Sequence, residues 1–248
     1  MKLTHKLCGA ALLAAVGVSL AIPSTTKALE DTNKGGMDIQ FARKTTGDID
    51  PGHSEEVVSS GKTMSIPGGT YKEFGVEGVT PLSFGEVTLA ANARTFWAKN
   101  WTQEGVGSSA NYVLINDERL TEDHNYSVSG QITGKLKAGE KELSGSTLMY
   151  SNIHLQSKAD ASIALPESAV ADGKTVTITE GETTPIINSR ADADKAKGQG
   201  RTHITFGYIK ATDATASDKS VALSIGNDQT VTQGDYTGEI TWTMSTTK

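Results

Sequence analysis

Few side chains in this sequence have the type and spacing that metal binding requires. Beyond the N-terminal segment the histidines are His53, His124, His154 and His203, and no two of them have the close spacing of a zinc site. Cys8 is the single cysteine, so the sequence offers no cluster of thiolates and no disulfide. We therefore expect no metal site and no cofactor.

Paired carboxylates are the next candidates for chemistry. Asp117 with Glu118, and Glu122 with Asp123, fall in one polar hairpin, for which a solvated loop is the simplest interpretation. A glycosidase would need two carboxylates about 5–10 Å apart across a cleft. A carbohydrate-active enzyme that uses this hairpin is therefore one competing hypothesis.

Other matches to catalytic signatures are incomplete. Ser59 and Lys62 fit a Ser-x-x-Lys pattern, but the partner motifs of penicillin-binding enzymes are missing. The segment "DIDPG" (48–52) is only a fragment of a calcium loop, and Gly130–Lys135 lacks the glycine spacing of a phosphate-binding loop. We therefore expect no catalytic residue and a protein that is not an enzyme.

Tryptophan placement is more informative. Only 6% of the residues are aromatic, and the three tryptophans are Trp97, Trp101 and Trp242. Indole rings stack on sugars and anchor protein interfaces, but they also fill cores. The pattern favours a core position for Trp242, whereas Trp97 and Trp101 fit an exposed aromatic rim and a core position about equally.

The sequence around the tryptophans and the other candidate residues predicts short strands. In "ITWTM" (240–244), Ile240, Trp242 and Met244 alternate with two threonines, as on a half-buried strand. Similar runs rich in Thr, Ser, Val and Ile recur along the chain with Gly, Asn and Asp between them. They are 80–99, 112–115, 125–136, 146–157, 174–181, 201–210, 220–227 and 236–244. The sequence predicts an all-β protein, an antiparallel β-sandwich of Ig-like or related Greek-key type, with little helix.

The N-terminal segment indicates export. Residues 1–28 combine Lys2 and Lys6, an apolar run and small residues before a predicted cleavage after Ala28, which is the layout of a secretory signal peptide. Cys8 lies too early in the run for lipid attachment, and the run is too short to remain as a spanning helix. We expect a secreted protein that does not span the membrane.

The charge balance limits the partners. Cleavage would remove three lysines, lowering the 23 basic residues to 20 and the net charge from −6 to −9. Such an acidic chain is poorly suited to nucleic acid, to anionic membranes and to anionic wall polymers.

The composition also divides the exported part. Residues 29–78 are loop-rich with one expected strand around Met37, Ile39 and Phe41, and we interpret them as an N-terminal arm that could pack on the main domain. The predicted β domain covers residues 79–248.

The C-terminal block resembles a known family. "YTG" (236–238) followed by a strand with Trp242-Thr243-Met244 is similar to the ending of WxL-domain cell-surface proteins of low-GC Gram-positive bacteria. Segments 81–98, 142–152, 174–189 and 220–244 resemble the family as well. Met244 replaces the usual leucine of this distal motif, and the proximal motif diverges to Tyr126-Ser127-Val128.

The resemblance implies non-covalent attachment to the cell wall at the cell surface. The implied partners are peptidoglycan, a membrane-tethered surface protein or other WxL proteins. On this basis we expect the two motifs to lie close together, with Tyr126, Val128, Trp242 and Met244 as a docking patch. The alternatives are a purely structural role for Trp242 and, at the level of function, an adhesin that binds host matrix protein.

Overall fold

The computed structural model describes residues 30–42, 69–88, 93–104, 107–121, 123–157, 165–170, 173–189, 197–207 and 217–247. The predicted signal peptide with Cys8, the "DIDPG" segment, His53 and the Ser59/Lys62 pair lie outside these residues. Every element in the described part is a strand, so the all-β prediction is confirmed. No helix in this part is long and apolar enough to cross a membrane.

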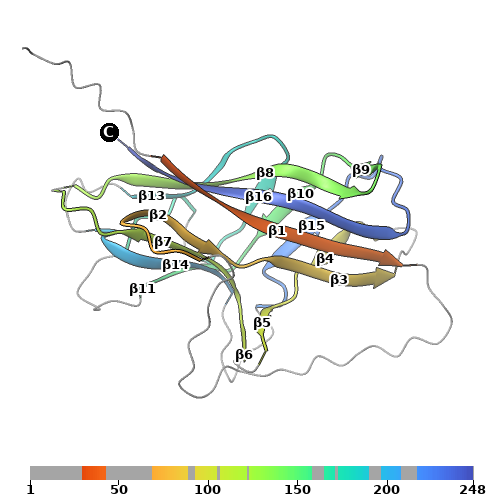
Figure 1. Ribbon diagram of the computed structural model, residues 1–248, viewed down its shortest axis with the longest axis horizontal. Helices are drawn as coiled ribbons and strands as arrows, with labels where there is room; N and C mark the ends of the chain where they lie inside the picture. Colours follow the sequence, from red (N-terminus) through yellow and green to blue (C-terminus); the bar gives the residue numbers. More distant parts are fainter. Residues whose placement is uncertain are drawn as a thin grey trace, which may run out of the picture.

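A six-stranded sheet forms one layer of the molecule (Figure 1). Its order is β13–β8–β16–β1–β3, with β9 paired to β8. The strands are β1 (Glu30–Ala42), β3 (Leu82–Thr88), β8 (Tyr126–Ala138), β9 (Lys141–Leu143), β13 (Thr184–Ser189) and β16 (Gly234–Thr246). All neighbours are antiparallel except β1 and β3, which are parallel.

Two four-stranded sheets complete the sandwich. The β10 sheet has the order β12–β10–β15–β4, with β4 (Thr95–Trp97), β10 (Thr147–Tyr150), β12 (Val176–Thr179) and β15 (Val221–Ser224). The β7 sheet has the order β11–β14–β7–β2, with β2 (Phe74–Val79), β7 (Asn111–Asp117), β11 (Ile153–Ser157) and β14 (Gly200–Phe206). A separate hairpin of β5 (Trp101–Gln103) and β6 (Gly107–Ser109) projects from the body (Figure 1).

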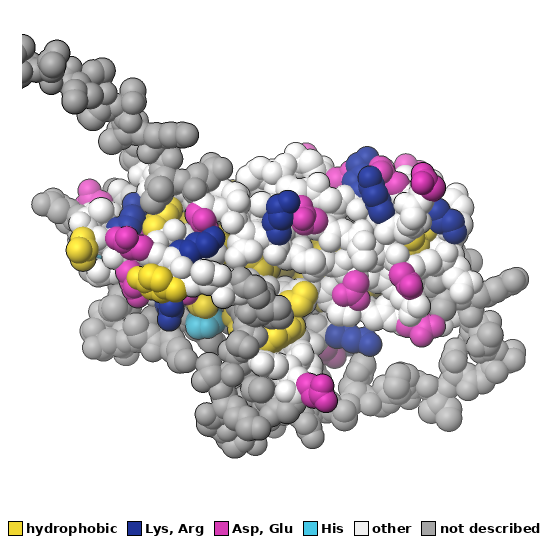
Figure 2. Space-filling model, in the orientation of Figure 1, with side chains coloured by type: hydrophobic (Ala, Val, Ile, Leu, Met, Phe, Trp, Pro, Cys, Tyr) yellow, Lys and Arg dark blue, Asp and Glu magenta, His cyan; other side chains and the backbone are white. Residues whose placement is uncertain are grey.

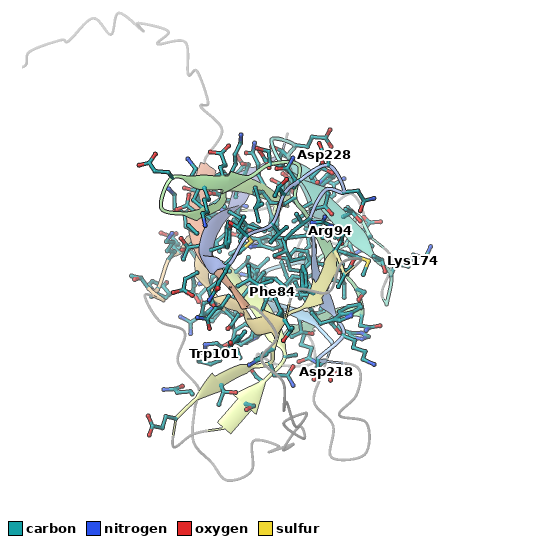
Figure 3. The ribbon with its side chains drawn as sticks, turned by 90° about the vertical axis from the view of Figure 1, so that its right-hand side faces the viewer. Phe84, Arg94, Trp101, Lys174, Asp218 and Asp228 are labelled. Carbon is teal, nitrogen blue, oxygen red and sulfur yellow. The ribbon has the colours of Figure 1, made fainter. Side chains whose placement is uncertain are left out.

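One apolar core joins the three large sheets. Along strands such as β8, β14 and β16, buried residues alternate with more exposed ones, as a side-chain period of two requires. The core cluster includes Ile240 of the six-stranded sheet, Leu148 of the β10 sheet and Ile115 of the β7 sheet. Phe84 of β3 also belongs to this cluster, and its side chain lies in the interior in the end-on view of Figure 3. The predicted antiparallel β-sandwich is therefore confirmed.

Strand β1 occupies a central place in this architecture. It comes from the segment interpreted as an N-terminal arm, and it lies between β16 and β3 in the six-stranded sheet. Its inward side chains Met37 and Ile39 are buried in the common core. The arm thus contributes a strand to the same core as residues 79–248.

Candidate functional site

The two motif segments lie on neighbouring antiparallel strands, β8 and β16. Met244 is opposite Val128, and Trp242 is opposite Gly130. The distal and proximal motifs therefore meet at the Met244–Val128 pair, although the sequence separates them widely. The expected proximity of the motifs is seen directly in this register.

The inward face of this strand pair belongs to the core. Tyr126, Val128, Trp242 and Met244 each have a relative exposure of 0%. The Trp242 ring contacts Tyr150 of the β10 sheet at 5.6 Å and Phe206 of the β7 sheet at 5.9 Å between centroids. Trp242 thereby links all three sheets.

Gly130 makes this packing possible, a role that was not predicted from the sequence, where Gly130 was considered only as part of an incomplete phosphate-binding pattern. A Cβ at Gly130 would lie 2.6 Å from Cδ1 of Ile178 and 3.4 Å from Cζ3 of Trp242. The missing side chain leaves room for Ile178 of the opposite sheet beside the indole ring. A glycine in the interior of a predicted strand is the available sequence signal for such a close approach.

The polar atoms of the two buried aromatic motif residues differ in their partners. The Tyr126 hydroxyl donates a hydrogen bond to the carbonyl oxygen of Gly198 at 3.0 Å. Burial, with a smaller contribution from the negative charge of Asp117, raises the pKa of Tyr126 far above its ordinary value, so the phenol stays neutral. None of the described residues accepts a hydrogen bond from Nε1 of Trp242.

The burial of these side chains determines whether they can form the expected docking patch. Fully buried side chains present no surface to a wall polymer or a protein. The structure therefore favours the structural role for Trp242 that the sequence analysis kept open, and it places the other three side chains of the patch in the core with it.

The outward face of the same strand pair is polar and partly exposed. Ser127 and Thr243, the central residues of the two motifs, point to this face together with their neighbours in register. A pocket of ≈ 290 Å³ opens on it, lined by Ser129, Gly130, Gln131, Thr183, Thr241, Thr243 and Ser245. Figure 2 shows a largely uncharged surface over the middle of the molecule, interrupted by adjoining basic and acidic side chains and flanked by further charged groups.

Hydrogen bonds order the side chains around this pocket. The hydroxyl oxygens of Thr133 and Thr241 lie 2.7 Å apart, and Gln131 Nε2 donates to the carbonyl oxygen of Gly181 at 3.3 Å. The Thr133 hydroxyl donates to Glu239 Oε1 at 3.0 Å, so Thr241 donates to Thr133 and both hydroxyl oxygens keep an acceptor site for a ligand. The arrangement can bind a neutral, hydroxyl- and amide-rich ligand, and its lining residues include no acid or base for catalysis.

The other two tryptophans lie on different strands, β4 and β5, neither of which contributes to this face. Trp97 lies on β4 of the β10 sheet and is 39% exposed. Trp101 is 8% exposed and lies where the β5–β6 hairpin leaves the body (Figure 3). Only Trp97 offers its ring to solvent.

The carboxylates of the acidic hairpin have structural partners. Asp117 is fully buried, and Arg119 donates to both of its oxygens at 2.7 Å, while His124 Nδ1 lies 3.0 Å from Oδ2. The Tyr71 hydroxyl donates to Glu118 at 2.8 Å. Glu122 lies outside the described residues. Asp117 is a fully buried, ion-paired anchor of the hairpin, and its carboxylate is not exposed to a substrate.

Metal binding has no candidate in the described ranges. No group of three or more His, Cys, Asp or Glu side chains is placed there to hold an ion.

Comparison with known proteins identifies a family. A family model described as "WxL domain surface cell wall-binding" matches residues 24–247, nearly the whole chain. No curated protein matches the chain.

Proposed function

Because the chain belongs to the WxL family of surface cell wall-binding domains, we propose that this cell-surface protein binds peptidoglycan directly and non-covalently, without catalysis. The contact surface in this proposal is the outward face of β8 and β16, centred on the pocket beside Thr241 and Thr243. The observation that carries it is the register that brings both motif segments to one polar face.

The chemistry of the pocket supports a glycan ligand. Peptidoglycan strands present hydroxyl and acetamido groups, which both donate and accept hydrogen bonds. Ser and Thr hydroxyls and the Gln131 carboxamide offer the complementary donors and acceptors. The pocket lining carries no formal charge, which suits a neutral saccharide.

Net charge argues against the anionic polymers of the wall as the ligand. The whole chain has a net charge of −6, and the predicted cleavage after Ala28 would make it −9. Long-range repulsion would therefore oppose binding to polyanions, whereas a neutral glycan experiences no such force.

The proposal assigns different roles to alternate residues of the motifs. Trp242 and Met244 hold β16 against the core, and Thr241 and Thr243 contact the ligand. Removal of the indole should then reduce binding only through loss of folded protein. Removal of hydroxyl groups should reduce binding while the fold is kept.

The first test is co-sedimentation with peptidoglycan stripped of protein and anionic polymers. A Ser129→Ala, Thr241→Val, Thr243→Val variant should bind at least tenfold more weakly than the unsubstituted protein. Three lost hydrogen bonds cost about 0.5–1.5 kcal/mol each, and about 1.4 kcal/mol corresponds to a tenfold change in affinity. Thr237→Val, an exposed substitution on β16 away from the pocket lining, is the matched control and should bind normally.

A second variant, Trp242→Ala, tests whether the tryptophan acts on the fold or on the ligand. We expect it to lower the free energy of unfolding by about 3–5 kcal/mol, as for a buried aromatic side chain. Its folded fraction, measured by circular dichroism, should retain normal affinity. Weak binding by fully folded Trp242→Ala protein, with normal binding by the triple variant, would contradict the proposed roles.

Two outcomes would replace peptidoglycan as the ligand. Binding to intact cells but not to stripped peptidoglycan would indicate a membrane-tethered surface protein or another WxL protein. Binding to immobilised host matrix proteins, without binding to walls, would indicate an adhesin.

A further inference from the structure

Strand β1 lies between two strands that are distant from it in the chain. Its neighbours are β16, the last strand, and β3. The chain leaves β1 at Ala42 and reaches β2 at Phe74 only after residues 43–73. The position of β1 in the sheet is therefore maintained by non-covalent contacts on both sides and by one long connection.

β1 occupies the space between β16 and β3, which we call the slot, and its contacts there are specific. From Glu30 to Phe41 the strand pairs with β16 without a register shift, and from Met37 to Ala42 it pairs with β3. Met37 and Ile39 enter the core with exposures of 3% and 1%. A Cβ at Gly35 would lie 2.9 Å from Cγ1 of Val79, so this point of the slot admits only a glycine without rearrangement.

Polar contacts reinforce the register. Asp31 forms an ion pair with Lys72 at 2.6 Å and accepts a hydrogen bond from the backbone N–H of Val76 at 3.0 Å. Lys34 pairs with Glu239 of β16 at 3.0 Å. All these partners belong to residues 72–245, so the slot recognises the sequence of β1 whichever copy of the chain supplies it.

The connection is long enough for the strand to be supplied by a neighbour. A strand of 13 residues is about 43 Å long. Thr70 and Lys72 are hydrogen-bonded to Glu77 in the body of the molecule, so the connection that can extend is residues 43–69, which at about 3.3 Å per residue could span up to about 90 Å. A connection of this length permits insertion of β1 into its own molecule or into a second one.

We propose that the slot between β16 and β3 accepts β1 from a second copy of this chain, so that copies associate by exchanging their first strand. The exchanged form makes the same strand contacts as the closed monomer, and the two forms differ in the connection and in the entropy of association. Reciprocal exchange gives a dimer, and one-way exchange gives longer chains. The effective concentration of a tethered strand is on the order of millimolar for short flexible linkers and falls as the linker lengthens. Exchange is therefore favoured where copies are crowded, as on a densely coated surface, and during folding at high concentration.

The register supplies a direct test. Thr32 of β1 is opposite Thr243 of β16, and both lie on the outward face. Paired cysteines at directly opposed strand positions lie within reach of a disulfide. In a Cys8→Ser background, the engineered cysteines would be the only thiols of the full-length chain.

The experiment mixes two single-cysteine variants, Thr32→Cys and Thr243→Cys, with tags of different mass. The variants are unfolded together, refolded at high protein concentration and oxidised. We expect a disulfide-linked heterodimer on a non-reducing gel, at a yield at least tenfold above that of Thr32→Cys mixed with Thr237→Cys. Thr237 lies on the same face of β16 but opposite Asp38, so it controls for random collisions.

The double variant Thr32→Cys, Thr243→Cys in a single chain verifies the geometry. Refolded at high dilution, it should form the disulfide within one molecule. If it does so while the mixed single variants give no more heterodimer than the control, strand exchange is excluded. Because this test contains no peptidoglycan, its result is independent of the proposed wall ligand.

Discussion

At the scale of single residues, successive side chains of the two motifs point to opposite faces of their strands, one buried and one exposed. Trp242 and Met244 lie in the core, and Thr243 between them points outward. The alternation that makes the tryptophan structural also makes its polar neighbours available to a ligand. In this chain one face of the strand therefore packs in the core, and the other carries the hydroxyl groups of the proposed binding face.

Gly130 provides a prediction at this scale. Gly130→Ala should lower the free energy of unfolding by about 1–3 kcal/mol, because the new methyl group overpacks the buried Ile178 and Trp242 contact. Urea denaturation followed by tryptophan fluorescence measures the change. Gly36→Ala is the control, because a Cβ at this outward position of β1 meets no atom within 4 Å. Equal stability of the two variants would show that the Gly130 site has unused space.

At the scale of elements, the outward side chains of β8 change from uncharged to charged along the strand. Its first half carries the hydroxyl groups of the proposed binding face, and its second half carries Lys135 and Lys137. Both lysines pair with Glu142 of β9, at 2.7 and 3.1 Å. This charged end, visible over β8 and β9 in Figure 2, connects the short β9 strand to β8 through exposed ion pairs.

The Glu142 carboxylate makes this pairing pH-dependent. Hydrogen bonds from Lys135 and then Lys137 lower the pKa of Glu142 from 4.5 to about 2. Because the pKa is lower in the folded state than in the unfolded state, the stabilisation is present above about pH 4.5 and is lost as the pH falls toward 2. Wild-type protein should exceed Glu142→Gln in stability at pH 7, and the difference should vanish near pH 2.

Denaturant titrations across this pH range measure the difference. Glu140→Gln removes the same charge from the adjacent β8–β9 turn and serves as the control. A Glu142 effect that persists unchanged at pH 2 would mean that the carboxylate charge does not contribute to the stability of this end.

At the scale of the whole molecule, the three large sheets share one core, and β1 and β2 are part of it. The core cluster includes Met37 and Ile39 from β1, and Phe74 and Val76 from β2. The family match over residues 24–247 likewise extends through this region. We therefore propose that residues 30–247 fold as one cooperative unit.

A truncation tests this proposal. A fragment of residues 79–248 should show no cooperative thermal transition by circular dichroism, whereas residues 29–248 should unfold in one transition. Four lost buried side chains remove about 1.5–3 kcal/mol each, which approaches the total stability of about 5–15 kcal/mol of a typical domain. The deletion also leaves the pairing edges of β16 and β7 open. A cooperative transition in the fragment at an unchanged temperature would support an independent domain starting at residue 79.

The sequence alone determined the class of fold and the family. Alternation in runs such as 125–136 and 236–244 is a local property of the chain, since successive side chains of a strand point to opposite faces. The WxL resemblance likewise rested on short contiguous segments. The strands β2, β5, β6, β9 and β13 were not predicted. β5, β6 and β9 have only three residues each, while Gly75 and Gly78 in β2 and Pro185 in β13 interrupt the apolar alternation.

Only the tertiary structure decided which face of each strand is buried and which strands are neighbours. The alternation of side chains along β16 puts Trp242 and Thr243 on opposite faces. Burial of the tryptophan, however, depends on Tyr150 and Phe206, which belong to other sheets. The pairing of Trp242 with Gly130 and the insertion of β1 beside β16 depend on register between distant segments. Such pairings follow from the packing energy of the complete core, because no local pattern specifies the partner of a strand.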